Sequence, residues 1–193
     1  MRRLALLALL AVLAWSTVWP ASAESPARQR VARINGGWPI DDFTLIDQRG
    51  TPFTRQQLRG RWTLVLFGDT HCGEPCTTVL SALRGMSERI APTQKLKTTQ
   101  VLFISLGGDT PADLARYLAP FDKRFVGVSG SPAAIERLAD DLGVAETLPV
   151  PGESESTHVL VLVDPEAVVW GQFLPPFDAM MLTARYLKTR VGR

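Results

Sequence analysis

One stretch, residues 62–80, constrains the fold of this chain more than any other. Residues 62–67 (WTLVLF) form a continuous apolar run that predicts a buried strand, and residues 77–84 predict a helix. Between them lie both cysteines of the chain, Cys72 and Cys76, and one of its two histidines, His71. The N-terminus of a helix offers unpaired N–H groups and the positive end of the helix dipole, and both favour a thiolate over a thiol. The sequence therefore predicts sulfur chemistry at a strand-to-helix corner.

Strands and helices alternate along the rest of the chain. The hydrophobic pattern predicts further strands at residues 101–106, 125–128, 157–163 and 168–173, and helices at 75–90, 110–118, 131–142 and 176–188. Residues 43–53 predict a hairpin that turns at Gly50. This order predicts an α/β fold: a mostly parallel central sheet flanked by helices, with an extra N-terminal β-hairpin and an antiparallel closing hairpin. Such an arrangement is thioredoxin-like.

The N-terminal residues predict export. Arg2 and Arg3 precede an apolar core, and an Ala-x-Ala site ends at Ala23, so residues 1–23 have the pattern of a signal peptide. The core at residues 4–13 is shorter than the ~20 residues that span a bilayer. Residues 15–19 could extend it, which leaves an uncleaved inner-membrane anchor as an alternative. Either way, we expect the protein to face the periplasm.

The mature chain is expected to consist of a tether at residues 24–39 and one domain at residues 40–193. Without Arg2 and Arg3, the chain carries 19 basic and 19 acidic residues. No basic block remains, and this argues against nucleic acid as a partner. Two cysteines in an exported protein would ordinarily be paired.

The spacing of the cysteines favours a metal site. If Cys72 and Cys76 both lie in the first helical turn, their Cβ atoms are about 5–6 Å apart, whereas a relaxed disulfide has them at about 3.5–4.5 Å. A disulfide would therefore require the turn to unwind. Two thiolates at this distance can converge on Cu(I), and an added imidazole makes a site that also holds Cu(II). The alternative is a structural disulfide, and a peroxidase is excluded because Asp69 stands where its threonine is needed.

The segment at residues 68–80, GDTHCGEPCTTVL, resembles the copper-site segment of the Sco/SenC family, G-[YF]-T-H-C-P-D-V-C-P-T-T-L. The resemblance continues in order through DFTLID at 42–47, LFIS at 102–105, DTP at 109–111 and FDKRFVGVSGSP at 121–132. It implies a membrane-facing protein of thioredoxin fold that binds one copper ion. It also implies help in building the CuA centre of cytochrome c oxidase, by donating copper or by reducing a disulfide of the acceptor.

The resemblance implies Cys72 and Cys76 as metal ligands and as the redox-active, catalytic thiols, with a distant histidine as third ligand. The family histidine stands eight residues before the turn that closes its strand. Counting back from Asp164 reaches Ser156, two residues before His158. His158 is the only histidine outside the cysteine corner, so it is the candidate third ligand. The alternative is a histidine held at the end of a strand, and His71 is expected to lie behind the ligands or to be exposed.

Three departures from the family pattern affect the site. Asp69 replaces an aromatic residue and would raise the pKa of the nearby thiols. Residues 73–75 read GEP instead of P-D-V, and residues 106–108 are shorter than the family's D-P-E-R. These departures concern copper affinity more than the fold.

Two other functions remain open. One is a periplasmic thiol–disulfide oxidoreductase without stable copper, although such enzymes use C-x-x-C and a cis-proline before a later strand. Here Ser156 and Thr157 occupy that place, and Pro151 lies further upstream. The other is a binding module with a structural disulfide. The expected partner is the oxidase subunit that carries CuA or another periplasmic thiol protein, near the membrane through the N-terminal segment.

Overall fold

The computed structural model describes residues 32–33, 37–148 and 158–191. The strands are β1 (Ala32–Arg33), β2 (Thr44–Asp47), β3 (Pro52–Thr54), β4 (Trp62–Gly68), β5 (Thr99–Ser105), β6 (Val126–Ser129), β7 (Leu160–Val163) and β8 (Val169–Phe173). The helices are α1 (Glu74–Ile90), α2 (Pro111–Leu118), α3 (Pro132–Asp141) and α4 (Ala179–Val191), with short 3-10 turns η1 (Arg55–Leu58), η2 (Gln94–Thr98) and η3 (Ala145–Thr147). The predicted N-terminal hairpin is confirmed as β2 and β3.

The described strands form one sheet in the order β1-β8-β7-β4-β5-β6-β2-β3. Only the central pairs, β4 with β5 and β5 with β6, are parallel. The sheet is therefore mixed rather than mostly parallel, because an antiparallel hairpin joins it on each side: β2–β3 beside β6, and β7–β8 beside β4. The expected order of a parallel β-α-β-α-β core followed by an antiparallel closing hairpin is present.

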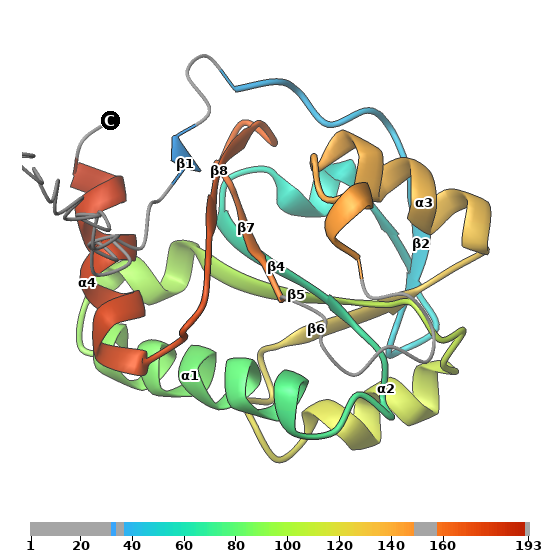
Figure 1. Cartoon of the computed structure of the whole chain (residues 1–193), viewed down its shortest axis with the longest axis horizontal. Coiled ribbons are helices and arrows are strands. Elements are labelled where there is room, and N and C mark those ends of the chain that lie inside the picture. The colour runs from blue at the N-terminus through green and yellow to red at the C-terminus, as the bar shows by residue number, and fades with distance from the viewer. Residues whose placement is uncertain (1–31, 34–36, 149–157, 192–193) are drawn as a thin grey trace, which may run out of the picture.

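Helices cover both faces of the sheet (Figure 1). All seven residues of β4 are buried, as its continuous apolar run predicts. Leu64 and Leu66 pack in the cluster that contains the inward faces of α1, α2 and α4, whereas Val65 and Phe67 pack on the other face with α3 and η1. The side chains of β7 alternate in the same way, with its leucines on the α1 face and its valines opposite. The face of the sheet that α1, α2 and α4 cover is the one that carries the cysteines.

Residues of the expected tether take part in the sheet. Ala32 and Arg33, inside the predicted tether, pair with β8, and Pro39 bridges to Val168. The predicted signal peptide at 1–23 lies outside the described residues. Within the described ranges, no helix has both the length and the apolar character needed to cross a membrane.

Candidate metal and thiol site

The cysteines lie where β4 passes into α1. The strand ends at Gly68 and the helix begins at Glu74, with Pro75 in its first turn as expected. Gly73 caps the helix with φ of 67° and ψ of −140°, a backbone conformation that residues with a Cβ rarely adopt. The two cysteines therefore do not share a helical turn: Cys76 lies in α1, and Cys72 lies in the loop before it.

Cys72 and Cys76 form a disulfide, with their Cα atoms 5.7 Å apart. We expected such a bond to require unwinding of the first helical turn, and the non-helical backbone at Cys72 and Gly73 meets that requirement. Cys76 is completely buried, whereas Cys72 is partly exposed. The pair thus consists of one residue buried in the core and one that is partly exposed.

His158 lies against both sulfurs. Its Nε2 atom is 3.3 Å from Sγ of Cys72 and 3.2 Å from Sγ of Cys76, and the residue is only 8% exposed. The ligand atoms of the three residues all lie within 4.8 Å of one another. The structure therefore brings together the three site residues named from the sequence.

The pairing of β7 with β4 positions this histidine. Leu160 stands opposite Leu66 in the antiparallel register, and continuing that register by two residues sets His158 level with Gly68. A Cβ on Gly68 would come within 2.6 Å of the sulfur of Cys76. Glycine at the end of β4 thus provides the space in which the buried sulfur meets the imidazole.

The chemistry of the disulfide fixes the role of the ring nitrogen. Sulfurs bonded to each other carry no hydrogen, so Nε2–H of His158 must be the donor in these contacts. A metal would need the Nε2 lone pair instead, with the ring proton on Nδ1. Nε2 of His158 would therefore have to give up its proton before it could hold a metal together with the reduced sulfurs.

Two other side chains at the strand-to-helix corner, those of His71 and Asp69, are more exposed. The side chain of His71 is 91% exposed, so of the two positions expected for it, behind the ligands or exposed, the structure has the second. Asp69 accepts a 2.7 Å hydrogen bond from the backbone N–H of His71. Its expected effect on the pKa of the thiols remains a prediction, because both sulfurs are in the disulfide.

Sequence reasoning missed Asp109, which accepts hydrogen bonds from the backbone N–H and the hydroxyl of Thr70, two residues before Cys72. Burial, together with the charges of Asp69 and Asp109, raises the pKa of Tyr117 nearby. The signal was present, because Asp109 follows a buried strand that is parallel to β4. The carboxyl ends of parallel strands lie at the same edge of a sheet.

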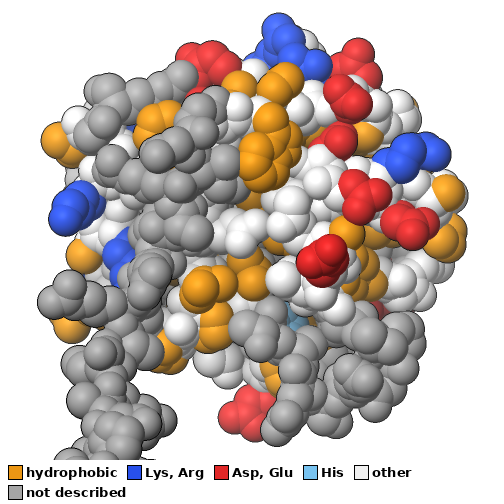
Figure 2. Space-filling view, turned by 45° about the horizontal axis from the view of Figure 1, so that its top comes forward, with side chains coloured by type: hydrophobic (Ala, Val, Ile, Leu, Met, Phe, Trp, Pro, Cys, Tyr) orange, Lys and Arg blue, Asp and Glu red, His pale blue; other side chains and the backbone are white. Residues whose placement is uncertain are grey.

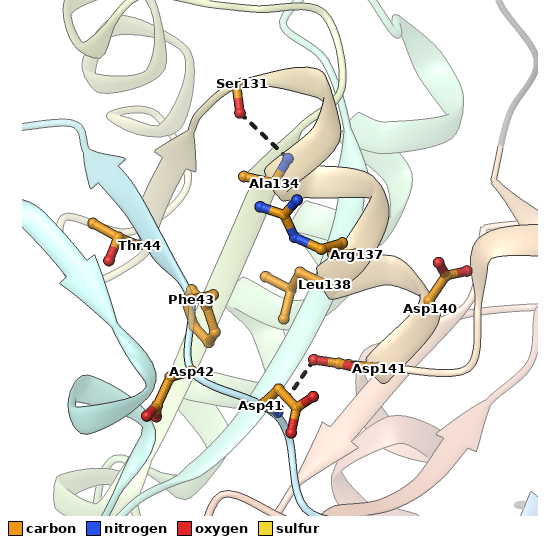
Figure 3. Close-up of a pocket in the computed structure, with 10 residues that line it drawn as sticks. All are labelled: Asp41, Asp42, Phe43, Thr44, Ser131, Ala134, Arg137, Leu138, Asp140 and Asp141. Carbon is orange, nitrogen blue, oxygen red and sulfur yellow. Dashed lines mark hydrogen bonds between the residues drawn. The ribbon is translucent and has the colours of Figure 1, made fainter.

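Two hollows differ in their chemistry. One, of about 420 Å³, lies beside His158 and is lined mainly by apolar groups, among them Pro75, Val79 and Phe177. The other, of about 650 Å³, lies between residues 41–44 and α3. Figure 2 shows acidic side chains gathered on one part of the face that it presents. Figure 3 shows the second hollow with its four carboxylates: Asp41, Asp42, Asp140 and Asp141.

Comparisons with known proteins agree with the geometry. The SCO1/SenC family model matches residues 37–188. A Stutzerimonas stutzeri protein named "Putative copper-binding protein" is 30% identical over 143 residues, which are 71% of this chain and 70% of that protein. The mitochondrial SCO2 homologue of Bos taurus is 35% identical over 100 residues, 51% of this chain but only 38% of that protein.

Among solved structures, the crystal structure of Arabidopsis thaliana ScoI with copper bound matches with a TM-score of 0.71 and 25% identity, over 79% of this chain and 98% of that one. The fold and the site define a thioredoxin-like protein with a Cys–Cys–His cluster. The chain belongs to the SCO1/SenC family.

Proposed function

We propose that this protein binds one copper ion through Cys72, Cys76 and His158 and assists assembly of the CuA centre of cytochrome c oxidase. The observation that carries the proposal is the approach of His158 Nε2 to both sulfurs, at 3.3 and 3.2 Å. The donor set fits the ion, because thiolates select Cu(I) and an added imidazole suits copper in either oxidation state. The copper-bound ScoI and the named copper-binding relative support the same assignment.

The Cys72–Cys76 disulfide must be reduced before copper can bind. The disulfide takes up two electrons and two protons from a thiol reductant to give the two thiols of Cys72 and Cys76, and the reductant becomes a disulfide. Copper then replaces the thiol protons, which are released, and takes the lone pair of Nε2. The copper ion is cargo in this scheme, passed on to an acceptor.

The location and the acceptor belong to the same proposal. The N-terminal signal pattern supports a periplasmic protein, held near the inner membrane if the signal stays uncleaved. The acceptor is the oxidase subunit that carries CuA, which receives either copper or reducing equivalents. Another periplasmic thiol protein is the alternative partner.

The test is a competition titration of the reduced, oxygen-free mature protein with Cu(I) and a chelator. We expect one ion per chain, with binding lost in Cys72→Ser and weakened in His158→Ala. The matched control is His71→Ala, because His71 is adjacent to Cys72 and its side chain is 91% exposed. Unchanged affinity in His158→Ala would remove that residue from the site, and absence of binding in the wild type would overturn the proposal.

A thiol–disulfide oxidoreductase is the second candidate, favoured by the different exposure of the two cysteine residues. The Cys72 thiolate would attack a partner disulfide, form a mixed disulfide and expel one partner thiolate. The Cys76 thiolate would then attack Sγ of Cys72 and release the second partner thiolate. Fast reduction of a protein disulfide by a wild type that binds no copper would favour this function. A Cys72–Cys76 disulfide that stays intact in millimolar thiol would leave only a structural role.

A further inference from the structure

The loop that carries Cys72 rests against the segment after β5. Gly68 and Ser105 are paired at the ends of the parallel strands β4 and β5, and the N–H of Leu106 continues the ladder by donating to the carbonyl of Gly68 at 2.7 Å. A Cβ on Gly107 would come within 3.0 Å of Cβ of Asp69. The two loops therefore lie in direct contact, and the shortened segment 106–108 fits against the cysteine corner.

Asp109 joins these loops through its carboxylate. Oδ1 accepts a 2.6 Å hydrogen bond from the hydroxyl of Thr70, and Oδ2 accepts from the N–H of Thr70 at 3.0 Å and from the hydroxyl of Ser105 at 2.7 Å. Asp109 is 8% exposed. In the described part of the chain, no Lys, Arg or His lies within ion-pair distance of it. Three uncharged donors thus satisfy a nearly buried carboxylate, and such charge-assisted hydrogen bonds are strong.

The three sulfur and nitrogen ligands are held in different ways. Cys76 is fixed by α1 and the core, and His158 by the end of β7. Cys72 has no such element, since it precedes the helix. Its N–H donates to the carbonyl of Asp69 at 3.3 Å, and Thr70, one of the two residues between them, is bound to Asp109. Once the disulfide with Cys76 is reduced, the position of the Cys72 sulfur therefore depends on this loop.

We propose that Asp109 is a positioning residue that holds the Thr70–Cys72 loop so that the Cys72 sulfur stays beside His158 and Cys76. The inference rests on the proposed function and assigns it a residue that touches neither metal nor substrate. Asparagine in its place keeps the shape but exchanges one acceptor oxygen for an NH₂ donor. The NH₂ group can be accommodated only if the hydroxyl of Thr70 turns from donor to acceptor, and the remaining hydrogen bonds lose their charge assistance, so the hold on Thr70 is weakened.

The main test compares Asp109→Asn with Asp113→Asn. Asp113 is a matched control because it also accepts hydrogen bonds from the N–H and hydroxyl of a threonine, Thr110, but at the start of α2. We expect Asp109→Asn to weaken Cu(I) binding by about 10- to 100-fold, as the loss of supporting hydrogen bonds does at other metal sites. We also expect a shifted sulfur-to-Cu(II) absorption band. Asp113→Asn should leave both unchanged.

Substitutions at Thr70 separate positioning from general stability. Thr70→Val removes the hydroxyl bond to Asp109, and Thr70→Ser keeps it. We expect Thr70→Val to shift the absorption band in the same direction as Asp109→Asn, with less than additive effects in the double variant, and Thr70→Ser to restore the wild-type band. If Asp109→Asn does not fold, Thr70→Val and Thr70→Ser carry the test.

A redox measurement distinguishes this inference from the proposed function. The equilibrium of the Cys72–Cys76 disulfide with glutathione can be measured without copper, and we expect it to shift at least threefold in Asp109→Asn but not in Asp113→Asn. If the wild type binds no copper, the proposed function fails and this shift still tests the positioning role. A lower melting temperature with unchanged copper affinity, absorption band and glutathione equilibrium would overturn it.

Discussion

The sulfur cluster and the acidic hollow are both groups of potential metal ligands, but they are built differently. At the cluster, Cys76 and His158 are buried and their ligand atoms converge with that of Cys72 within 4.8 Å. At the hollow, Asp141 points toward Asp41 and accepts a 3.1 Å hydrogen bond from its backbone N–H, whereas Asp42 and Asp140 point away from each other (Figure 3). These carboxylates do not converge, and all but the partly buried Asp141 are exposed.

This difference shows that a metal site is marked by ligand atoms that converge on one point, more than by the number of potential ligands. Three separate elements fix the sulfur cluster: the loop before α1, α1 itself and the end of β7. Three of the four carboxylates of the hollow are exposed, and the fourth, that of Asp141, accepts a hydrogen bond from the chain, so no ion is needed to neutralise them. We therefore expect soft-metal chemistry at the first region and only surface electrostatics at the second.

The largest expected effect is on copper affinity. Removing a ligand sulfur by Cys76→Ser should weaken Cu(I) binding by more than about 100-fold, since even residues that only support metal ligands contribute 10- to 100-fold. The double variant Asp140→Asn, Asp141→Asn should leave the affinity unchanged. Competition titration under reducing conditions measures both, and a comparable loss in the double variant would contradict the contrast between the two regions.

The next effect is on stability at the buried sulfur. Gly68→Ala places a methyl group 2.6 Å from the sulfur of Cys76 and 3.1 Å from the ring of Phe103. Such overpacking should lower the free energy of unfolding by about 1–3 kcal/mol, which urea unfolding measures. The penalty should shrink in a Cys76→Ala background, where the sulfur is gone. An equal penalty in both backgrounds would show that the sulfur does not occupy this space.

A smaller effect concerns the backbone before α1. Gly73→Ala should lower the free energy of unfolding by about 1–2 kcal/mol, because φ of 67° is unfavourable for a residue with a Cβ. Gly50→Ala is the control: its φ is 77°, and at both positions an added Cβ meets nothing within 4 Å. Both should lose stability in urea unfolding, but only Gly73→Ala should change Cu(I) affinity. Equal copper affinity in both variants would mean that this backbone conformation does not matter to the site.

The smallest effect is a pH dependence at the acidic hollow. Burial raises the pKa of Asp141, the hydrogen bond from Asp41 lowers it, and the charges of Asp41 and Asp140 raise it further, with a net increase. The folded state then binds the proton more tightly than the unfolded state. The stability that this group contributes is complete below its ordinary pKa of about 3.9 and is lost as pH rises through the raised value.

The variant Asp141→Asn tests this, since its amide oxygen can still accept from the N–H of Asp41. Between pH 3.5 and 7, the free energy of unfolding should fall further in the wild type than in the variant. The difference should stay below about 1 kcal/mol, because the group is partly solvated. Urea unfolding across this range measures the difference. If the free energies of unfolding of the two proteins change in parallel with pH, or if the wild type becomes more stable relative to the variant as pH rises, the raised pKa of Asp141 is contradicted.

Much of the fold follows from local patterns. The predicted strand at 62–67 and helix at 75–90 correspond closely to β4 and α1, because a continuous apolar run and a helical interval are each legible in one segment. The pairing of Ala32 and Arg33 with β8 was not predictable, since two residues carry no periodicity. The mixed character of the sheet depends on where the two hairpins attach, which is a property of the assembled chain.

The candidate site, like the fold, was predictable from the sequence only in part. Cys72 and Cys76 were identifiable from their motif, but the separation of Cys72 from the helix arises from the positive φ of Gly73, which the sequence pattern does not reveal. The two-residue offset of His158 was resolved by the register of β7 against β4. Asp109 acts through a tertiary contact with Thr70, so neither segment alone predicts its role.

The central claim is that His158 joins the two sulfurs as a ligand. X-ray absorption at the copper edge of the Cu(I)-loaded, reduced protein tests it most directly, with His158→Ala and His71→Ala measured alongside. The account predicts two sulfurs and one imidazole nitrogen in the wild type and in His71→Ala, and loss of the nitrogen in His158→Ala. A wild type with sulfur ligands only, or a nitrogen that persists in His158→Ala, would contradict it.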